Sequence, residues 1–158
     1  WSNELETKGE VSNLDTFFEG MRKLNLPNSI FIDNTSNKDI VKYYEPTLNA
    51  SISVVTPNKV ANSGPYEYYL KLNTTAAKRN VQFLYETNVG AGLPVINTLN
   101  DLLLSGDKVI RIEAVLSGTL NFIFSSFTGE KPFSEIVKEA KEKGYTEPDP
   151  RDDLAEPM

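Results

Sequence analysis

Three short apolar segments alternate with helix-like segments along the first half of the chain, and this alternation is the strongest constraint on the fold. The apolar segments are SIFID (29–33), SISVVT (51–56) and VQFLYE (81–86). Each is rich in β-branched and aromatic residues, and each follows apolar residues at helical spacing. The order αβαβαβ predicts a parallel sheet with right-handed crossover connections.

Capping and helix-breaking residues indicate where these helices begin and end. Asn13 is expected to cap a helix over residues 14–24, and Pro46 to close a brief helix that carries Ile40 and Tyr44. Pro65 fits the first turn of a third helix, because its missing N–H has no intrahelical acceptor there anyway.

Polar loops follow each of the three predicted strands. They are DNTSN (33–37), TPNKVANSGP (56–65) and ETNVGAGLP (86–94). Parallel sheets bind ligands at the carboxyl ends of their strands. We therefore expect these loops to meet at one sheet edge and to form a candidate binding site.

The second half of the chain continues with further elements. A helix bearing Val95 to Leu103 should end at Ser105-Gly106, and DKVIRIEAVL (107–116) predicts a longer strand. SGTLNFIFSSF (117–127) should form a helix after a tight turn. Residues 133–144 predict an amphipathic helix, with Ser134 as its cap and Glu139 paired with Lys143.

Composition excludes several kinds of chemistry. Without Cys or His in its 158 residues, the chain cannot use disulfides, thiol nucleophiles, imidazole metal sites or His-based triads. Acid–base steps must use Lys, Tyr, Asp, Glu or water. A net charge of −6 argues against nucleic-acid and anionic-membrane partners. No apolar run or signal peptide is expected to direct the chain to a membrane, and we expect a cytoplasmic location.

Two of the polar loops carry groups suited to a nucleotide cofactor. Lys59 lies three residues beyond a strand end, where Pro57 restricts the backbone, so its ammonium could pair with phosphate or polarise a carbonyl oxygen. The alternative is a solvated loop lysine. DNTSN could bind phosphate, ribose or amide groups, or could simply cap the helix that follows.

The glycine-rich turn does not match a dinucleotide fingerprint. Gly90 and Gly92 are present, but the third glycine of G-x-G-x-x-G would fall at Val95. The turn could bring backbone carbonyls and amides close to a ligand or a small cation. A purely structural turn is the alternative.

Four acidic residues crowd around Arg151 near the end of the chain. They are Glu147, Asp149, Asp152 and Asp153, with Pro148 and Pro150 predicted to stiffen the loop between them. The group could be a solvated charge cluster. A calcium loop would need the EF-hand glycine and twelfth-position glutamate, which are absent. The third reading is a site for an ammonium-bearing small molecule, which would relieve the repulsion between carboxylates.

Four motifs, in order and at these intervals, resemble homoserine dehydrogenase. They are VTPNK, ETNVGAGLPVI, LSGTLNFIF and GYTEPDPRDDL, and the resemblance runs from about residue 28 to Leu154. It is closest to the dehydrogenase portion of bifunctional aspartokinase/homoserine dehydrogenase chains. It implies an α/β fold, with a partial Rossmann-like domain over residues 1–87. The start of an α+β substrate and dimerisation domain would follow over residues 88–158.

The resemblance also implies an activity and its partners. The family interconverts L-homoserine and L-aspartate 4-semialdehyde, on the path to threonine and methionine, with NAD or NADP as hydride carrier. A homodimer is expected. The positions that match cofactor contacts are Thr35, Asn58, Lys59 and Ser63, and Lys59 also matches a lysine implicated in catalysis near the reacting oxygen.

Substrate and cation positions carry over in the same way. Glu147 matches the glutamate expected to hold the amino group of homoserine. The positions that match its neighbours are Gly118, Thr119, Tyr145, Asp152 and Asp153. The family's monovalent-cation site, for an ion such as Na⁺, maps to Glu86, Val89, Ala91 and Leu93.

The chain departs from the family pattern at both ends. The Gly-rich nucleotide fingerprint that opens the family's domain is not in this sequence. After RDDL the chain reads AEPM, where the family continues toward a lysine taken as proton donor. The 158 residues alone are therefore expected to be catalytically silent. The alternative function is a non-catalytic regulatory or dimerisation module derived from the same fold.

Overall fold

The computed structural model describes residues 2–9, 11, 13–146 and 149–155. The chain divides into two compact units, residues 1–101 and residues 102–158. None of the helices in the described residues is long and apolar enough to cross a membrane.

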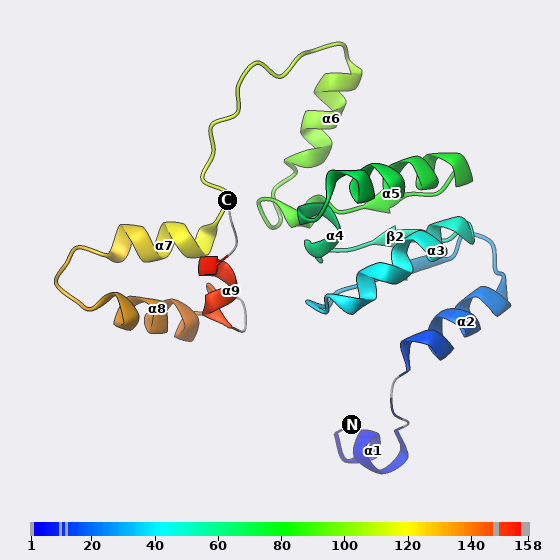
Figure 1. Ribbon diagram of the computed structural model, residues 1–158, viewed down its shortest axis with the longest axis horizontal. Helices are drawn as coiled ribbons and strands as arrows, with labels where there is room; N and C mark the ends of the chain where they lie inside the picture. The colour runs from blue at the N-terminus through cyan, green and yellow to red at the C-terminus, as the bar shows by residue number, and fades with distance from the viewer. Residues whose placement is uncertain (1, 10, 12, 147–148, 156–158) are drawn as a thin grey trace. The chain divides into compact units, whose positions relative to one another are not determined.

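The first unit is built on a three-stranded parallel sheet, as the sequence predicts. The strands are β1 (Ile30–Ile32), β2 (Ser53–Val55) and β3 (Phe83–Leu84), in the order β1-β2-β3 (Figure 1). Val54 sits in register with Phe31 on one side and with Phe83 on the other. Every connection between the strands contains helix, which is how parallel strands are joined.

Helices precede and follow these strands. They are α1 (Ser2–Lys8), α2 (Leu14–Leu24), the 3₁₀ helix η1 (Asp39–Tyr43), α3 (Tyr44–Asn49), α4 (Val60–Ser63), α5 (Tyr66–Arg79), the 3₁₀ helix η2 (Glu86–Asn88) and α6 (Ile96–Leu104). Asn13 caps α2 as expected, because its side chain accepts a hydrogen bond from the Thr16 N–H at 3.0 Å. Pro65 was expected in the first turn of the third helix, but it lies one position earlier, as the N-cap residue of α5.

Pro46 does not close a helix, contrary to the sequence prediction. It lies in the first turn of α3, which continues to Asn49. The first N–H groups of a helix have no intrahelical acceptor, so proline costs little there. The brief helix of the prediction is thus a 3₁₀ turn, η1, running directly into α3.

The core of the first unit lies where α2, α3 and α5 meet the sheet. Its fully buried side chains include Tyr44, Leu48, Val54 and Leu72. The prediction that residues 29–33 form a buried strand is right for one face only. Phe31 packs on Phe18 of α2 with a 4.8 Å ring separation. Ile30 and Ile32, the neighbours of Phe31 in β1, point to the other face and are mostly exposed.

Beyond α6, the described residues of the second unit form three helices. They are α7 (Gly118–Ser126), α8 (Phe133–Glu142) and α9 (Pro150–Ala155). Ile123 of α7 packs against Ile136 and Ala140 of α8. The Glu139–Lys143 pair of α8 forms as predicted, at 2.8 Å. Ser134 is not the cap of this helix, because α8 already begins at Phe133, after Pro132.

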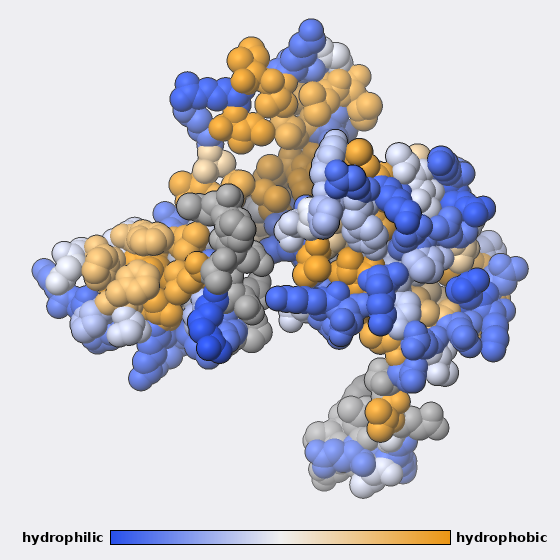
Figure 2. Space-filling model, in the orientation of Figure 1, coloured by the Kyte–Doolittle hydropathy of each residue, from blue (hydrophilic) through white to orange (hydrophobic). Residues whose placement is uncertain are grey.

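The predicted strand over residues 107–116 is absent. In the described part of the chain these residues take no regular structure, and Ile110 is 96% exposed. Figure 2 shows exposed hydrophobic side chains over α6 and the residues that follow it. A strand needs a neighbour for its N–H and C=O groups. All strand pairing among the described residues belongs to the sheet of the first unit.

Candidate functional site

The three polar loops converge at the carboxyl edge of the sheet, as predicted. Strand pairing continues past the ends of the strands. The Asp33 N–H donates to the Val55 carbonyl at 3.0 Å, and the Thr56 N–H donates to the Leu84 carbonyl at 2.9 Å. These bonds fix the start of each loop beside the next strand.

Asn58 joins the first loop to the second. Its amide nitrogen donates to the Asp33 carboxylate at 3.1 Å and to the Asn37 carbonyl at 3.0 Å. Its amide oxygen accepts from the Val60 N–H at 3.1 Å. Asn58 is almost fully buried, so it holds the loops together rather than presenting its amide to solvent. This use of a predicted cofactor-binding residue was not visible in the sequence.

Asn88 joins the third loop to the second. With its amide oriented so that donors face acceptors, its nitrogen donates to the carbonyls of Thr56 and Pro57, each at 3.2 Å. Its oxygen then accepts from the Asn62 amide at 2.8 Å. All three loops therefore belong to one hydrogen-bonded assembly.

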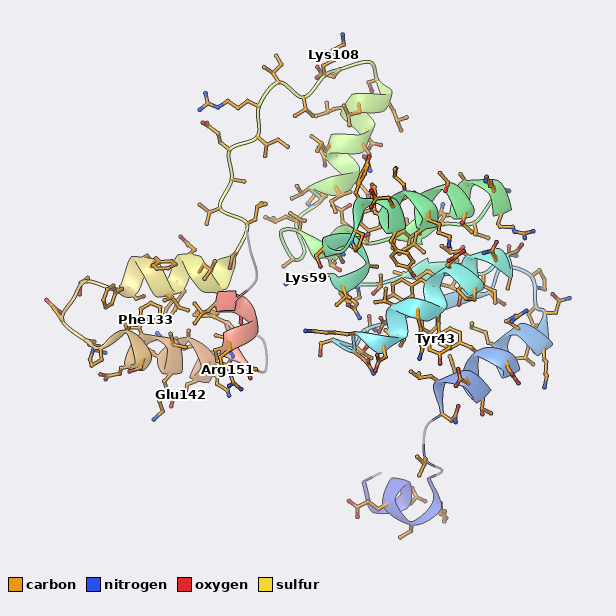
Figure 3. The ribbon with its side chains drawn as sticks, in the orientation of Figure 1. Tyr43, Lys59, Lys108, Phe133, Glu142 and Arg151 are labelled. Atoms are coloured by element: carbon orange, nitrogen blue, oxygen red, sulfur yellow. The ribbon has the colours of Figure 1, made fainter. Side chains whose placement is uncertain are left out.

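Lys59 lies between this assembly and α4, which it precedes directly (Figure 3). Its carbonyl accepts from the N–H groups of Asn62 and Ser63, each at 2.9 Å. The Lys59 side chain is exposed, as are those of Thr35 and Ser63. Thr35, Asn58 and Lys59 thus come to the same edge of the sheet on a fixed backbone.

A cleft of about 810 Å³ opens next to this edge, between the ends of β2 and β3 and the start of α6. It is lined by Asn34, Val55, Thr56, Pro57, Asn73, Phe83, Leu84, Tyr85, Glu86, Thr87, Ala91, Ile96, Asn97 and Asn100. Glu86 and Ala91 are predicted site residues, whereas Lys59 and Asn58 are not part of the lining.

Sequence reasoning missed the asparagines that α5 and α6 contribute to the cleft. Asn97 and Asn100 lie three residues apart on α6, and Asn73 comes from α5. Two asparagines about one turn apart on the same helix were the signal available.

Glu86 acts through its side chain as a clamp on the glycine-rich turn. Its two carboxylate oxygens accept from the N–H groups of Ile96 and Asn97, each at 2.8 Å. A carboxylate at a helix N-terminus satisfies N–H groups that have no intrahelical acceptor and interacts favourably with the helix dipole. The clamp closes the segment from Glu86 to the start of α6 into a loop.

The loop itself is tight. Gly90 and Ala91 have φ angles of +74° and +51°. A Cβ atom on Gly90 would come within 3.0 Å of the Val95 side chain, so glycine is required there by space as well as by conformation. The Leu93 carbonyl accepts from the Val95 N–H at 2.9 Å, which leaves its second lone pair for another partner.

The predicted substrate positions of the second unit come together in part. The Thr119 hydroxyl shares its proton between two acceptors. These are the Tyr145 carbonyl and the Asp153 carboxylate, the latter at 3.1 Å. Gly118 is the first residue of the same helix, α7. Asp152 lies in α9, and Glu147 lies outside the described residues.

The acidic segment is helical over residues 150–155, not a rigid loop as predicted. Pro150 is the first residue of α9, where proline is well tolerated. Asp149 precedes it and accepts from the Arg151 N–H at 3.0 Å, while the Arg151 guanidinium pairs with the same carboxylate at 2.6 Å. This hydrogen-bonded pair lowers the pKa of Asp149 to about 2. Part of the negative charge is thus balanced within the segment.

Two family models cover almost the whole chain. The model described as "Homoserine dehydrogenase, NAD binding domain" matches residues 1–86, and the model "Homoserine dehydrogenase" matches residues 94–155. The chain belongs to the homoserine dehydrogenase family. The resemblance noted from the four motifs is thereby confirmed.

Relatives within the homoserine dehydrogenase family include bifunctional and single-function proteins. The chain is 47% identical over 156 residues to a chloroplastic bifunctional aspartokinase/homoserine dehydrogenase of Zea mays. It is 40% identical over 159 residues to the homoserine dehydrogenase of Schizosaccharomyces pombe. Each alignment covers 98% of this chain, but only 17% of the maize protein and 42% of the S. pombe protein.

Solved structures give the same assignment. A hyperthermophilic archaeal homoserine dehydrogenase in complex with NADPH is 30% identical, with a TM-score of 0.73 over 94% of this chain and 47% of that one. A Candida auris protein of unknown function is 41% identical, with a TM-score of 0.76 over 96% of this chain and 44% of that one. The α/β fold with a Rossmann-type sheet is therefore that of homoserine dehydrogenases.

Proposed function

We propose that this chain forms part of the active site of a homoserine dehydrogenase, which interconverts L-homoserine and L-aspartate 4-semialdehyde. Residues 1–87 would belong to the NAD(P)-binding domain and residues 88–158 to the substrate and dimerisation domain. The observation that carries the proposal is the hydrogen-bonded convergence of three polar loops at the carboxyl edge of the sheet. Ligands of open α/β sheets bind at this place.

The first unit fits the nicotinamide end of NAD or NADP. Thr35, Lys59 and Ser63 would hold it, while the buried Asn58 fixes the loop that carries Lys59. The adjoining cleft of about 810 Å³ is large enough for the ring and its ribose. Bound there, the cofactor supplies or accepts the hydride. The protein aligns the reacting carbon and keeps the Lys59 ammonium where it can polarise the reacting oxygen.

The second unit supplies the substrate contacts. The carboxylate of Glu147 would bind the ammonium group of homoserine. Its neighbours would be Gly118, Thr119, Tyr145, Asp152 and Asp153. The bonds from Thr119 to the Tyr145 carbonyl and to Asp153 support this assignment, because they fix three of these positions relative to one another. Asp149 is paired with Arg151, so its charge is already partly balanced.

The Glu147→Gln substitution is made in a chimeric enzyme that carries residues 1–155 within the S. pombe homoserine dehydrogenase. It should raise KM for homoserine by about 10- to 100-fold, because a hydrogen bond to a charged group contributes roughly 1.5–3 kcal/mol. Steady-state kinetics with homoserine as the varied substrate measure this change. Asp149→Asn is the matched control and should change KM less than about threefold. Equal KM values for Glu147→Gln and the parent enzyme would remove Glu147 from the substrate site.

The glycine-rich loop would hold a monovalent cation such as Na⁺ through the carbonyls of Glu86, Val89, Ala91 and Leu93. Its tight turn and the spare lone pair at Leu93 fit such a role. Sodium chloride should then raise the thermal midpoint of the chain by a few degrees relative to choline chloride at equal ionic strength. Identical melting curves in the two salts would speak against the cation site.

A homodimer and a cytoplasmic location also belong to the proposal. Light scattering on the purified full-length protein would test the first. Fluorescent tagging of that protein in its own cells would test the second. The maize relative is described as chloroplastic, so a plastid signal is the alternative outcome.

A chimeric enzyme tests the proposed activity most cleanly. Residues 1–155 would replace the matching segment of the S. pombe enzyme, to which the chain is 40% identical. We expect the chimera to form NADPH from NADP in the presence of L-homoserine and not of D-homoserine. A chimera that folds and binds NADPH but does not turn over would favour the non-catalytic module. The 158-residue chain alone should show no turnover in the same assay.

A further inference from the structure

Asp33 is a buried carboxylate whose hydrogen-bonding capacity is filled. It is 1% exposed and follows directly after β1. One oxygen accepts from the N–H and the hydroxyl of Thr35, at 2.8 and 2.7 Å. The other accepts from the Tyr44 hydroxyl at 2.5 Å and from the Asn58 amide at 3.1 Å. A carboxylate offers about four lone-pair sites, so these donors replace its hydration shell.

Tyr44 closes the inner side of this arrangement. Its ring is fully buried in the core, and its hydroxyl lies 2.9 Å from the Thr56 hydroxyl as well as against Asp33. Burial, followed by the hydrogen bond to Asp33, raises the pKa of Tyr44. The phenol therefore keeps its proton and serves as a permanent donor to the carboxylate.

Two of the residues bonded to Asp33 lie in the loops that carry the candidate cofactor residues. Thr35 is held through both its backbone and its side chain. Asn58 is held through its side chain and comes directly before Lys59. The Asn58 N–H also donates to the Thr56 hydroxyl at 2.9 Å. The positions of the exposed residues Thr35 and Lys59 thus depend on the buried Asp33 carboxylate.

We propose that Asp33, supported by Tyr44, is a positioning residue that sets Thr35 and Lys59 in the geometry required to receive the nicotinamide cofactor. This inference rests on the proposed function, since it deepens the assignment of the same sheet edge. Asp33 does not touch the cofactor, because its oxygens are occupied and buried. It acts through Thr35 and Asn58.

Asp33→Asn and Tyr44→Phe separate this role from simple stabilisation. The Thr35 N–H cannot reverse, and the Asn58 amide is held in its orientation by the Asn37 carbonyl and the Val60 N–H. An amide at position 33 therefore sets its own NH₂ against one of these two donors. Tyr44→Phe removes only the supporting hydroxyl. Tyr43→Phe is the matched control, because the Tyr43 hydroxyl donates to Asp15 of α2 at the same 2.5 Å, away from these loops.

The experiment is a calorimetric titration of the chimeric enzyme with NADPH, together with hydrogen–deuterium exchange measured by mass spectrometry, at a temperature where each variant is folded. The dissociation constant for NADPH should rise about tenfold in Asp33→Asn and about fivefold in Tyr44→Phe, as loss of hydrogen bonds to a charged group implies. Exchange of the Thr35 amide hydrogen should accelerate about tenfold in both variants. Tyr43→Phe should change neither quantity.

Each outcome decides something. If Tyr44→Phe melts at a lower temperature but binds NADPH with an unchanged dissociation constant, Asp33 and Tyr44 only stabilise the fold and the inference is overturned. If Asp33→Asn fails to fold, Tyr44→Phe decides alone. If the chimera without these substitutions does not bind NADPH at millimolar concentration, the proposed function fails, and the positioning role fails with it.

Discussion

Lys59→Ala is expected to lower kcat of the chimeric enzyme by about 100- to 1000-fold, the effect of removing one preorganised group from a developing oxyanion. Lys59 is fixed between Asn58 and α4, so no other side chain of that loop can replace its ammonium. Lys59→Arg should recover little activity, because a guanidinium places its charge differently. Initial rates of NADPH formation at saturating homoserine measure kcat directly.

Lys78→Ala is the matched control for this substitution. Lys78 is exposed in the last turn of α5, which begins beyond the carboxyl end of β2 and ends before β3, so it lies toward the opposite edge of the sheet. We expect the control to retain full activity. A Lys59→Ala enzyme within about threefold of the parent would make Lys59 a solvated loop residue with no part in catalysis.

Leu48→Ala is expected to destabilise the first unit by about 2–5 kcal/mol, since it leaves a cavity in a packed core. Leu48 is fully buried where α3 meets the sheet. The measurement is urea unfolding followed by circular dichroism. Leu26→Ala is the control, because Leu26 is 61% exposed, and it should change the free energy of unfolding by less than about 0.5 kcal/mol.

Equal urea midpoints for Leu48→Ala and Leu26→Ala would show that Leu48 does not lie in the packed core. The loss of stability in Leu48→Ala also bears on function, because Leu48 and Tyr44 lie in the same helix, α3, and Tyr44 donates to Asp33 at the edge of the sheet. The Leu48 variant should therefore weaken NADPH binding only where it begins to unfold. The Tyr44 variant should weaken binding in the folded protein.

The parallel sheet was predictable because its signals are local. Each strand lies in a short run of β-branched or aromatic residues, and each is separated from the next by residues at helical spacing. Asn13 was predictable as a cap for the same reason. The segment 107–116 has an equally good strand pattern, yet it forms no strand in the described structure. Pairing depends on a neighbouring strand, which a local pattern does not report.

The convergence of the polar loops followed from topology, but the contacts inside it did not. Tyr44 looks like one apolar residue of a helix, and its hydrogen bond to Asp33 exists only once α3 lies on the sheet. The family resemblance assigned the Glu86 carbonyl to a cation and did not indicate that the Glu86 side chain caps α6 ten residues further on. Such roles arise from tertiary packing and have no sequence period.

A crystal structure of the chimeric enzyme with NADP and L-homoserine would show whether Glu147 and Lys59 bind one substrate molecule. We expect one homoserine molecule to contact the Glu147 carboxylate with its ammonium and the Lys59 ammonium with its reacting oxygen. Homoserine bound elsewhere, or no ligand shared by Glu147 and Lys59, would refute the proposed active site.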